Sequence, residues 1–185
     1  MNILALNPGS SSMKRASYQF PGGTRLQDSE RAEAVGVRVV HGGSKLVAPV
    51  KVDDGIIAEI DRLTELAPLH IPAALKAIDD ARRTHPGVPI VAVFDTAFHQ
   101  TMPAVAAQYA VPAALGVRRY GFHGISYSYI TSRVRASRHI ACHLGNGASV
   151  CAMRDGHSVD TSMGFTPMEG LVMGTRAGDL DPGVI

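Results

Sequence analysis

The chain has 185 residues, of which 45% are hydrophobic and 18% charged, a composition typical of a folded globular protein rather than a disordered one. Its formal net charge is only +2 and its basic residues are dispersed, which argues against a nucleic-acid partner, because nucleic-acid binders concentrate positive charge on one face. Scattered glycines and prolines without a repeat predict many short elements, in one compact domain or two small lobes.

Strands and helices alternate along the first half of the sequence. Short apolar or β-branched runs predict strands, and apolar residues at helical spacing predict helices that end near prolines. The expected elements are, in order, strands at 2–6, 13–20 and 34–40, helices at 56–66 and 72–83, and a strand at 88–94. The first two strands are expected to form a hairpin around a tight polar turn.

The second half begins with an Ala-rich segment, residues 103–112, which predicts a helix between two prolines. Strands are then expected at 138–143, 150–153 and 157–161, the last two joined in a hairpin around Asp155-Gly156. The pattern of strand, small polar loop and returning strand therefore occurs twice in the chain. This repetition indicates a pseudo-duplicated α/β fold of which only the first domain is complete.

Cysteine usage and the N-terminus indicate the compartment. Cys142 and Cys151 have neither a zinc-binding spacing nor a disulfide framework. The N-terminus has no basic and apolar leader, and no apolar stretch reaches membrane-spanning length. The prediction is a cytoplasmic protein without a membrane partner.

Two small polar loops follow predicted buried strands. The first runs from Asn7 to Ser12 with Lys14 behind it, and the second from His143 to Gly147. Backbone N–H groups, hydroxyls and a lysine in such loops can cradle an anion, although each loop alone is also compatible with an ordinary capped turn. Two of them at strand ends favour a site for a nucleotide's phosphates.

Charged side chains in unusual settings are further candidates. Arg38 interrupts an apolar run, so its guanidinium is either paired in a structural salt bridge or used in function. Asp95 ends a strand, where a carboxylate serves as a base or metal ligand or caps the next helix. Arg176 lies among glycines, in a shaped loop or as a solvated side chain. No pair of histidines has helical zinc spacing.

Taken together, these segments resemble acetate kinase, a family of the sugar kinase, actin and Hsp70 superfamily. The resemblance spans nearly the whole chain and runs through NILALNPGSSSMK, RVVHGG, LAPLHIPAAL, VAVFDTAFHQTMP, RRYGFHGIS, ACHLGNGASV and MGTRAGDLDP. It implies an α/β fold with a ribonuclease H-like domain of the actin and hexokinase type. The expected domains are a shortened N-terminal lobe, 1–135, and the beginning of a second nucleotide-binding lobe, 136–185.

The resemblance also implies a reaction: reversible phosphoryl transfer between ATP and acetate, with Mg²⁺, giving ADP and acetyl phosphate, in an enzyme that forms homodimers. It assigns catalysis to Asp95, His123 and Arg176, and a metal and phosphate contact to Asn7. Binding of acetate or acetyl phosphate would involve Arg38, Val40, Leu69, Phe122 and Pro167. ATP would be contacted by Lys14, His143, Leu144, Gly145, Asn146 and Gly147.

The sequence departs from the family's pattern in several places. The segments between Lys14 and Arg38 and around residues 129–139 are short, and the chain ends midway through a typical member. Val37 and Tyr127 stand where the family has histidine, and Ile71 stands where it has asparagine. Two hypotheses follow: an acetate kinase, or a non-catalytic remnant that at most binds phosphate or nucleotide weakly. The preference between acetate and propionate stays open, since one methylene changes binding only modestly.

Overall fold

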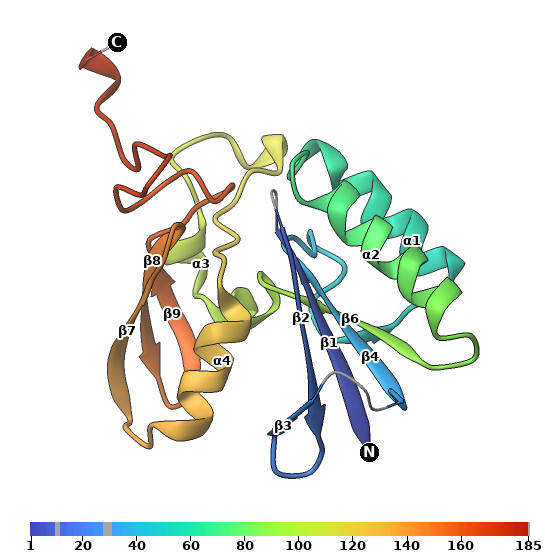
Figure 1. The fold of residues 1–185 in the computed structure, drawn as a ribbon. Helices are drawn as coiled ribbons and strands as arrows, with labels where there is room; N and C mark the ends of the chain where they lie inside the picture. Colours follow the sequence, from blue (N-terminus) through green and yellow to red (C-terminus); the bar gives the residue numbers. More distant parts are fainter. Residues whose placement is uncertain (10–11, 28–30, 185) are drawn as a thin grey trace. The chain divides into compact units, whose positions relative to one another are not determined.

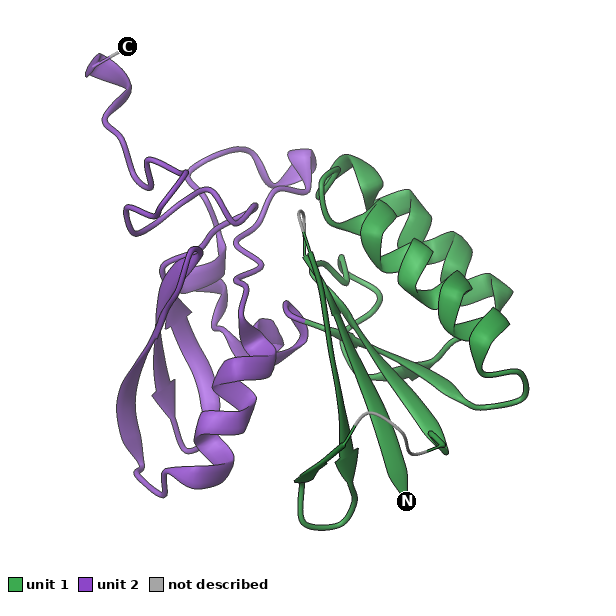
Figure 2. Ribbon diagram, viewed as in Figure 1, with its two compact units in different colours: residues 1–94 green, residues 95–185 purple. Residues whose placement is uncertain are grey.

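A computed structural model describes residues 1–9, 12–27 and 31–184, and these residues form two compact units, Met1–Phe94 and Asp95–Ile185 (Figure 2). The units therefore divide where the strand that ends at Phe94 gives way to Asp95. The predicted domain boundary between residues 135 and 136 lies inside the second unit. That boundary, which concerns the duplication rather than compactness, stays a prediction.

The first unit is built on a mixed sheet with the strand order β3-β2-β1-β4-β6-β5. Its strands are β1 (Asn2–Pro8), β2 (Met13–Gln19), β3 (Thr24–Leu26), β4 (Ala34–Val39), β5 (Val50–Lys51) and β6 (Ile90–Phe94). Strands β1, β2 and β3 form an antiparallel meander, while β4 and β6 continue the sheet in parallel with β1. The predicted α/β fold of ribonuclease H type is therefore confirmed.

Two helices lie side by side next to this sheet (Figure 1), and the second of them packs on one face of it. Helix α1 (Asp54–Asp61) begins at Asp53, whose carboxylate accepts a hydrogen bond of 2.8 Å from the backbone N–H of Ile56. It gives way to a 3₁₀ turn, η1 (Arg62–Glu65), so the predicted single helix to residue 66 is divided. Helix α2 (Ile71–Thr84) buries one apolar stripe against β1, β4 and β6. The stripe consists of Ile71, Ala74, Ala77, Ile78 and Ala81.

The second unit contains an antiparallel sheet, β7-β8-β9, and several short helices. The elements are η2 (Ala97–Thr101), α3 (Ala104–Ala107), η3 (Ala113–Leu115), α4 (Gly124–Arg133), β7 (Arg138–Leu144), β8 (Ala148–Arg154), β9 (His157–Thr161) and η4 (Pro182–Val184). Tyr127 of α4 packs with Ala141, Cys151 and Met153 of the sheet in one apolar cluster. The antiparallel order β7-β8-β9 repeats that of β1-β2-β3, as expected for the start of a second, duplicated domain.

The predicted helix over residues 103–112 is wrong. Only Ala104–Ala107 are helical, and Gln108 turns to an extended conformation that bridges to Arg118. The backbone N–H of Arg119 donates to the carbonyl oxygen of Ala107 at 2.7 Å. Alanine propensity alone does not extend so short a helix when a neighbouring segment supplies strand-like hydrogen bonds.

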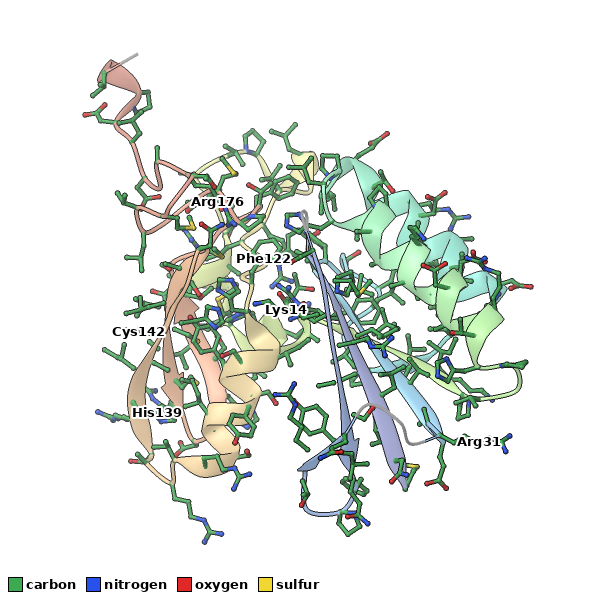
Figure 3. The ribbon with its side chains drawn as sticks, in the orientation of Figure 1. Lys14, Arg31, Phe122, His139, Cys142 and Arg176 are labelled. Atoms are coloured by element: carbon green, nitrogen blue, oxygen red, sulfur yellow. The ribbon has the colours of Figure 1, made fainter. Side chains whose placement is uncertain are left out.

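The cysteines are both free thiols, Cys142 exposed on β7 and Cys151 buried on β8, in agreement with the absence of a disulfide framework. Figure 3 labels Cys142 on its strand. Among the helices of the described residues, none is long and apolar enough to cross a bilayer.

Candidate active site

His123 has a strained backbone at the start of α4. Its φ of 58° and ψ of 20° place it in the left-handed region, which costs a non-glycine residue about 1 kcal/mol. The next residue, Gly124, donates its backbone N–H to the carbonyl oxygen of Asp95 at 2.9 Å. This hydrogen bond ties Asp95 to the start of the helix within the second unit. Strain of this kind concentrates at functional sites, where the surrounding structure maintains it.

The imidazole of His123 is held on two sides. Its Nδ1 lies 2.8 Å from the hydroxyl oxygen of Ser149, and its ring stacks on that of His143 with centroids 4.0 Å apart and planes 20° from parallel. The Nδ1 of His143 is in turn 3.1 Å from the hydroxyl of Ser126. Each ring of the stacked pair is therefore oriented by a serine, one from β8 and one from α4.

Arg176 lies beside His123 at the Gly147 turn. A Cβ added at Gly147 would lie 3.3 Å from Arg176 Nη2 and 3.3 Å from His123 Nε2, so glycine leaves both nitrogens close to the backbone. Arg176 Nη1 donates to the carbonyl oxygen of Pro167 at 2.7 Å, and Met173 N–H donates to the carbonyl oxygen of Arg176 at 3.0 Å. The guanidinium is therefore part of a shaped loop (Figure 3), the first of the two alternatives that the sequence left open.

The rest of the second polar loop presents backbone and amide groups. Leu144, Gly145 and Asn146 are exposed, and Gly145 N–H donates to the carbonyl oxygen of Gly147 at 3.1 Å. Gly174 packs so closely that a Cβ there would lie 2.6 Å from the side-chain oxygen of Asn146. The loop thus meets the segment that carries Arg176 at more than one point.

Asp95 is buried, with 1% of its surface exposed, at the first position of the second unit. The N-cap position of η2 is held by Thr96 rather than by Asp95, and the Thr96 side chain makes no capping hydrogen bond. The carbonyl of Asp95 accepts from Gly124, the neighbour of His123. Asp95 and His123 are thereby linked within the second unit by the hydrogen bond from Gly124, the residue after His123, to the Asp95 carbonyl oxygen.

Phe122 is buried next to His123 and is fixed by His99. His99 Nε2 lies 2.9 Å from the Phe122 carbonyl oxygen, and His99 Nδ1 lies 2.8 Å from the hydroxyl of Ser158. A carbonyl only accepts, so Nε2 carries the ring hydrogen and Nδ1 accepts from the serine. Burial lowers the pKa of His99, although the hydrogen bond to Phe122 and the charge of Asp95 act in the opposite direction.

The neutral state of His99 predicts a pH-dependent stability. Since its pKa is lower in the folded chain than the ordinary value of about 6.5, the unfolded chain binds more protons below that pH. The stabilisation is complete above about pH 6.5 and is lost as the pH falls through the folded value. We expect His99→Gln to reduce the decline in the free energy of unfolding between about pH 7.5 and 5.5 in urea titrations. His157→Gln, at an exposed position, is the control; equal declines for His99→Gln and the unaltered chain would contradict this role.

The first unit brings together three of the predicted site residues. Asn7 and Lys14 are paired across β1 and β2, and Arg38 Nη1 donates to the side-chain oxygen of Asn7 at 2.9 Å. Figure 3 labels Lys14 on β2. Gly9 N–H donates to the carbonyl oxygen of Ser12 at 2.8 Å, which closes the first polar loop. The serines at positions 10 and 11 of that loop lie outside the described residues.

The predicted walls of the substrate pocket differ in exposure. Val40 and Phe122 are buried, Pro167 is partly exposed and Leu69 is 71% exposed. Val40 and Leu69 belong to the first unit, whereas Phe122 and Pro167 belong to the second. Their shared role as a methyl pocket stays a prediction.

The described residues do not form a metal site of their own. No group of three or more His, Cys, Asp or Glu side chains among them could hold a metal ion. The oxygen of Asn7, the predicted ligand, accepts from the Arg38 guanidinium, and a cationic neighbour disfavours a second cation. Mg²⁺ in phosphoryl-transfer enzymes is bound mainly by substrate phosphates, waters and one or two carboxylates, so we assign no step to it from these contacts.

Sequence reasoning missed the residues that support the site. Ser149 lies two residues after the second polar loop, and Tyr127 lies one helical turn after His123. A further group, Tyr109, Arg119 and Glu169, holds the segment that precedes Arg176. The serine in ACHLGNGASV was visible as part of a motif, but its contact with His123 depends on the packing of α4 against β8, which spacing does not reveal.

Comparisons with known proteins agree with this geometry. The model of the Acetokinase family matches residues 22–185. An acetate kinase of Helicobacter acinonychis is 51% identical over 172 residues, covering 86% of this chain and 43% of that protein. An acetate kinase of Deinococcus radiodurans is 49% identical over 193 residues, covering 95% of this chain and 48% of that protein. The chain thus spans less than half the length of these curated relatives.

Solved structures give the same result. The Porphyromonas gingivalis acetate kinase matches 100% of this chain, with 62% of that chain covered, a TM-score of 0.89 and 36% identity. A propionate kinase from Francisella tularensis matches 99% of this chain, with 62% of that chain covered, a TM-score of 0.91 and 35% identity. The family model covers most of the sequence, and the solved structures match the fold over 99–100% of this chain. The chain therefore belongs to the acetate kinase (acetokinase) family of phosphotransferases.

Proposed function

We propose that this chain takes part in reversible phosphoryl transfer between ATP and acetate, giving ADP and acetyl phosphate, with Mg²⁺ bound through the nucleotide. The observation that carries the proposal is the convergence of His123 Nε2 and Arg176 Nη2 on the Gly147 turn. A guanidinium, an imidazole and backbone N–H groups supply the charge neutralisation and positioning that phosphoryl transfer requires. The relatives named above are acetate kinases, and one structural relative is a propionate kinase, so both carboxylic acids are candidate substrates.

The remaining assignments follow from this role. Arg176 and His123 would neutralise the transferred phosphoryl group, and Asp95 would align the reacting groups in the second unit. Arg38 would bind the carboxylate or acetyl phosphate, with Asn7 and Lys14 contacting phosphates in the first unit. A carboxylate is already a competent nucleophile, so little general-base catalysis is required of Asp95. We propose a cytoplasmic location and a homodimer on the same family basis.

The test is the hydroxamate assay for acetyl phosphate, run on the purified chain with ATP, Mg²⁺ and acetate, and repeated with propionate. We expect Arg176→Ala to lower activity on the order of 100-fold or more, as removal of a donor to a developing anion does. Arg154→Ala, at an exposed position of β8, is the matched control and should retain activity. Equal activity in the Arg176 variant and the unaltered chain would refute the proposed site.

A second candidate function is phosphate or nucleotide binding without turnover. It requires only the groups at the Gly147 turn, His123 Nε2 and Arg176 Nη2, which lie within one unit. It predicts no hydroxamate from the unaltered chain, together with saturable binding of inorganic phosphate that Arg176→Ala weakens.

A further inference from the structure

A buried chain of hydroxyl groups leads from the core of the second unit to His123. The phenol oxygen of Tyr127 lies 2.5 Å from the hydroxyl oxygen of Ser149, which lies 2.8 Å from Nδ1 of His123. Tyr127 and Ser149 are both fully buried. The three residues come from the body of α4, from β8 and from the start of α4, so the contact joins the helix to the sheet at two points.

The direction of these hydrogen bonds follows from the groups around Tyr127. Burial raises the pKa of Tyr127 to about 12, so the group is a neutral phenol with one hydrogen to donate. A phenol is a stronger hydrogen-bond donor and a weaker acceptor than an aliphatic hydroxyl, because its oxygen lone pair is delocalised into the ring. In the 2.5 Å contact between the two oxygens the phenol therefore donates and Ser149 accepts.

Ser149 then has one hydrogen of its own, and His123 Nδ1 is its other partner. If the serine accepts from Tyr127, its hydrogen is directed to Nδ1, which must be the unprotonated ring nitrogen. The hydrogen of a neutral His123 then lies on Nε2. That nitrogen faces the Gly147 turn next to Arg176 Nη2, where a second positive charge on the imidazole would be unfavourable.

We propose that Tyr127 is a positioning residue that acts through Ser149 to fix His123 as the neutral tautomer with hydrogen on Nε2. This nitrogen is thereby a hydrogen-bond donor toward whatever occupies the Gly147 turn. The use of that donor on a phosphoryl oxygen rests on the proposed function, whereas the tautomer does not. Position 127 is one of those at which the sequence departs from the family's motif, so the phenol is a feature of this chain rather than of the motif.

The tautomer is measured directly by long-range ¹H–¹⁵N NMR on the full chain with ¹⁵N-labelled histidine, and His123→Gln assigns the resonance. At neutral pH we expect hydrogen on Nε2 and none on Nδ1. Tyr127→Phe removes the donor to Ser149, so the serine can also accept from Nδ1, and the two nitrogen shifts should move toward each other. Tyr129→Phe, at an exposed position of the same helix, is the matched control and should leave both shifts unchanged.

The outcomes separate this inference from the proposed function. Hydrogen on Nδ1 in the unaltered chain, or unchanged His123 shifts in a folded Tyr127→Phe variant, would overturn it. If the Tyr127→Phe variant does not fold, the inference is tested instead by the position of the ring hydrogen of His123 in the unaltered chain and in the Ser149→Ala variant. Inorganic phosphate should bind the folded Tyr127→Phe variant about fivefold more weakly, as expected for one displaced hydrogen bond. If the NMR shifts are as expected but the unaltered chain binds no phosphate, the positioning role of Tyr127 is supported and only the proposed function is contradicted.

Discussion

Replacement of Gly124 with alanine should destabilise the second unit by about 3 kcal/mol, because the new methyl group has no space. A Cβ at this position would lie 2.1 Å from the carbonyl oxygen of Asp95 and 2.8 Å from Cβ of Phe98. The first of these is a backbone atom, so the chain itself must move. The movement would also break the 2.9 Å hydrogen bond from Gly124 N–H to that oxygen, which adds about 1 kcal/mol to a cost of about 2 from overpacking.

The sign of this effect is informative. Gly124 is the first residue of α4, and alanine is the better helix former by up to about 1 kcal/mol, so propensity alone predicts stabilisation. Thermal unfolding should instead show the melting temperature lowered by roughly 6–12 °C. Gly36→Ala in β4 is the control, because a Cβ there would meet nothing within 4 Å. A Gly124→Ala protein that melts at or above the unaltered chain would show that Asp95 and the start of α4 are not in close contact.

Loss of the Glu169 carboxylate should have the next largest effect, about 2 kcal/mol for Glu169→Ala. Glu169 Oε1 lies 2.5 Å from Arg119 Nη2, and its other oxygen accepts from the hydroxyl of Tyr109. Burial and the carboxylate together raise the pKa of Tyr109 to about 12, so the phenol keeps its hydrogen. Arg119 and Glu169 are 21% and 30% exposed, which reduces the cost below that of a fully buried ion pair.

This group of side chains also supports the proposed site. The Tyr109 oxygen accepts from Phe165 N–H at 2.8 Å, and Glu169 is followed by the loop that carries Arg176. A double-mutant cycle of Tyr109→Phe and Glu169→Gln, read by urea unfolding, should give a coupling energy of about 1 kcal/mol. Phosphate binding should weaken in the Glu169 variants as the Arg176 loop loses its support. Strictly additive effects on stability, with binding unchanged, would show that the two side chains act independently.

Much of the first unit could be predicted because its pattern is local. The strands β1, β4 and β6 are predicted by their apolar runs, and α2 by the helical spacing of its apolar stripe. The short edge strands β3 and β5 lack such a pattern and were not expected. Helix α4 was also missed, because Gly124, Ser126 and the β-branched Ile130 and Thr131 give it little intrinsic propensity. It forms because Tyr127 is buried against β7 and β8.

The candidate site was predictable in its residues but not in its contacts. Motifs pointed to His123, Arg176 and the loop up to Gly147, and the structure places these three side by side in one unit. The roles of Ser149 and Tyr127 depend on hydrogen bonds between a helix and a strand that are distant in sequence. The Ala-rich segment near Gln108 shows the opposite error, in which propensity indicated a helix and tertiary hydrogen bonding formed an extended bridge.

The central claim is that His123, Arg176 and the Gly147 turn form an anion site in the second unit. It is tested most directly by titrating inorganic phosphate into the ¹⁵N-labelled chain and following the Gly147 amide, the His123 ring and the Arg176 side chain by NMR. We predict saturable shifts at these three groups with one common dissociation constant, no shift at the exposed His157, and about tenfold weaker binding in Arg176→Ala. Absence of these shifts, or equal and non-saturating shifts at His157, would contradict the account.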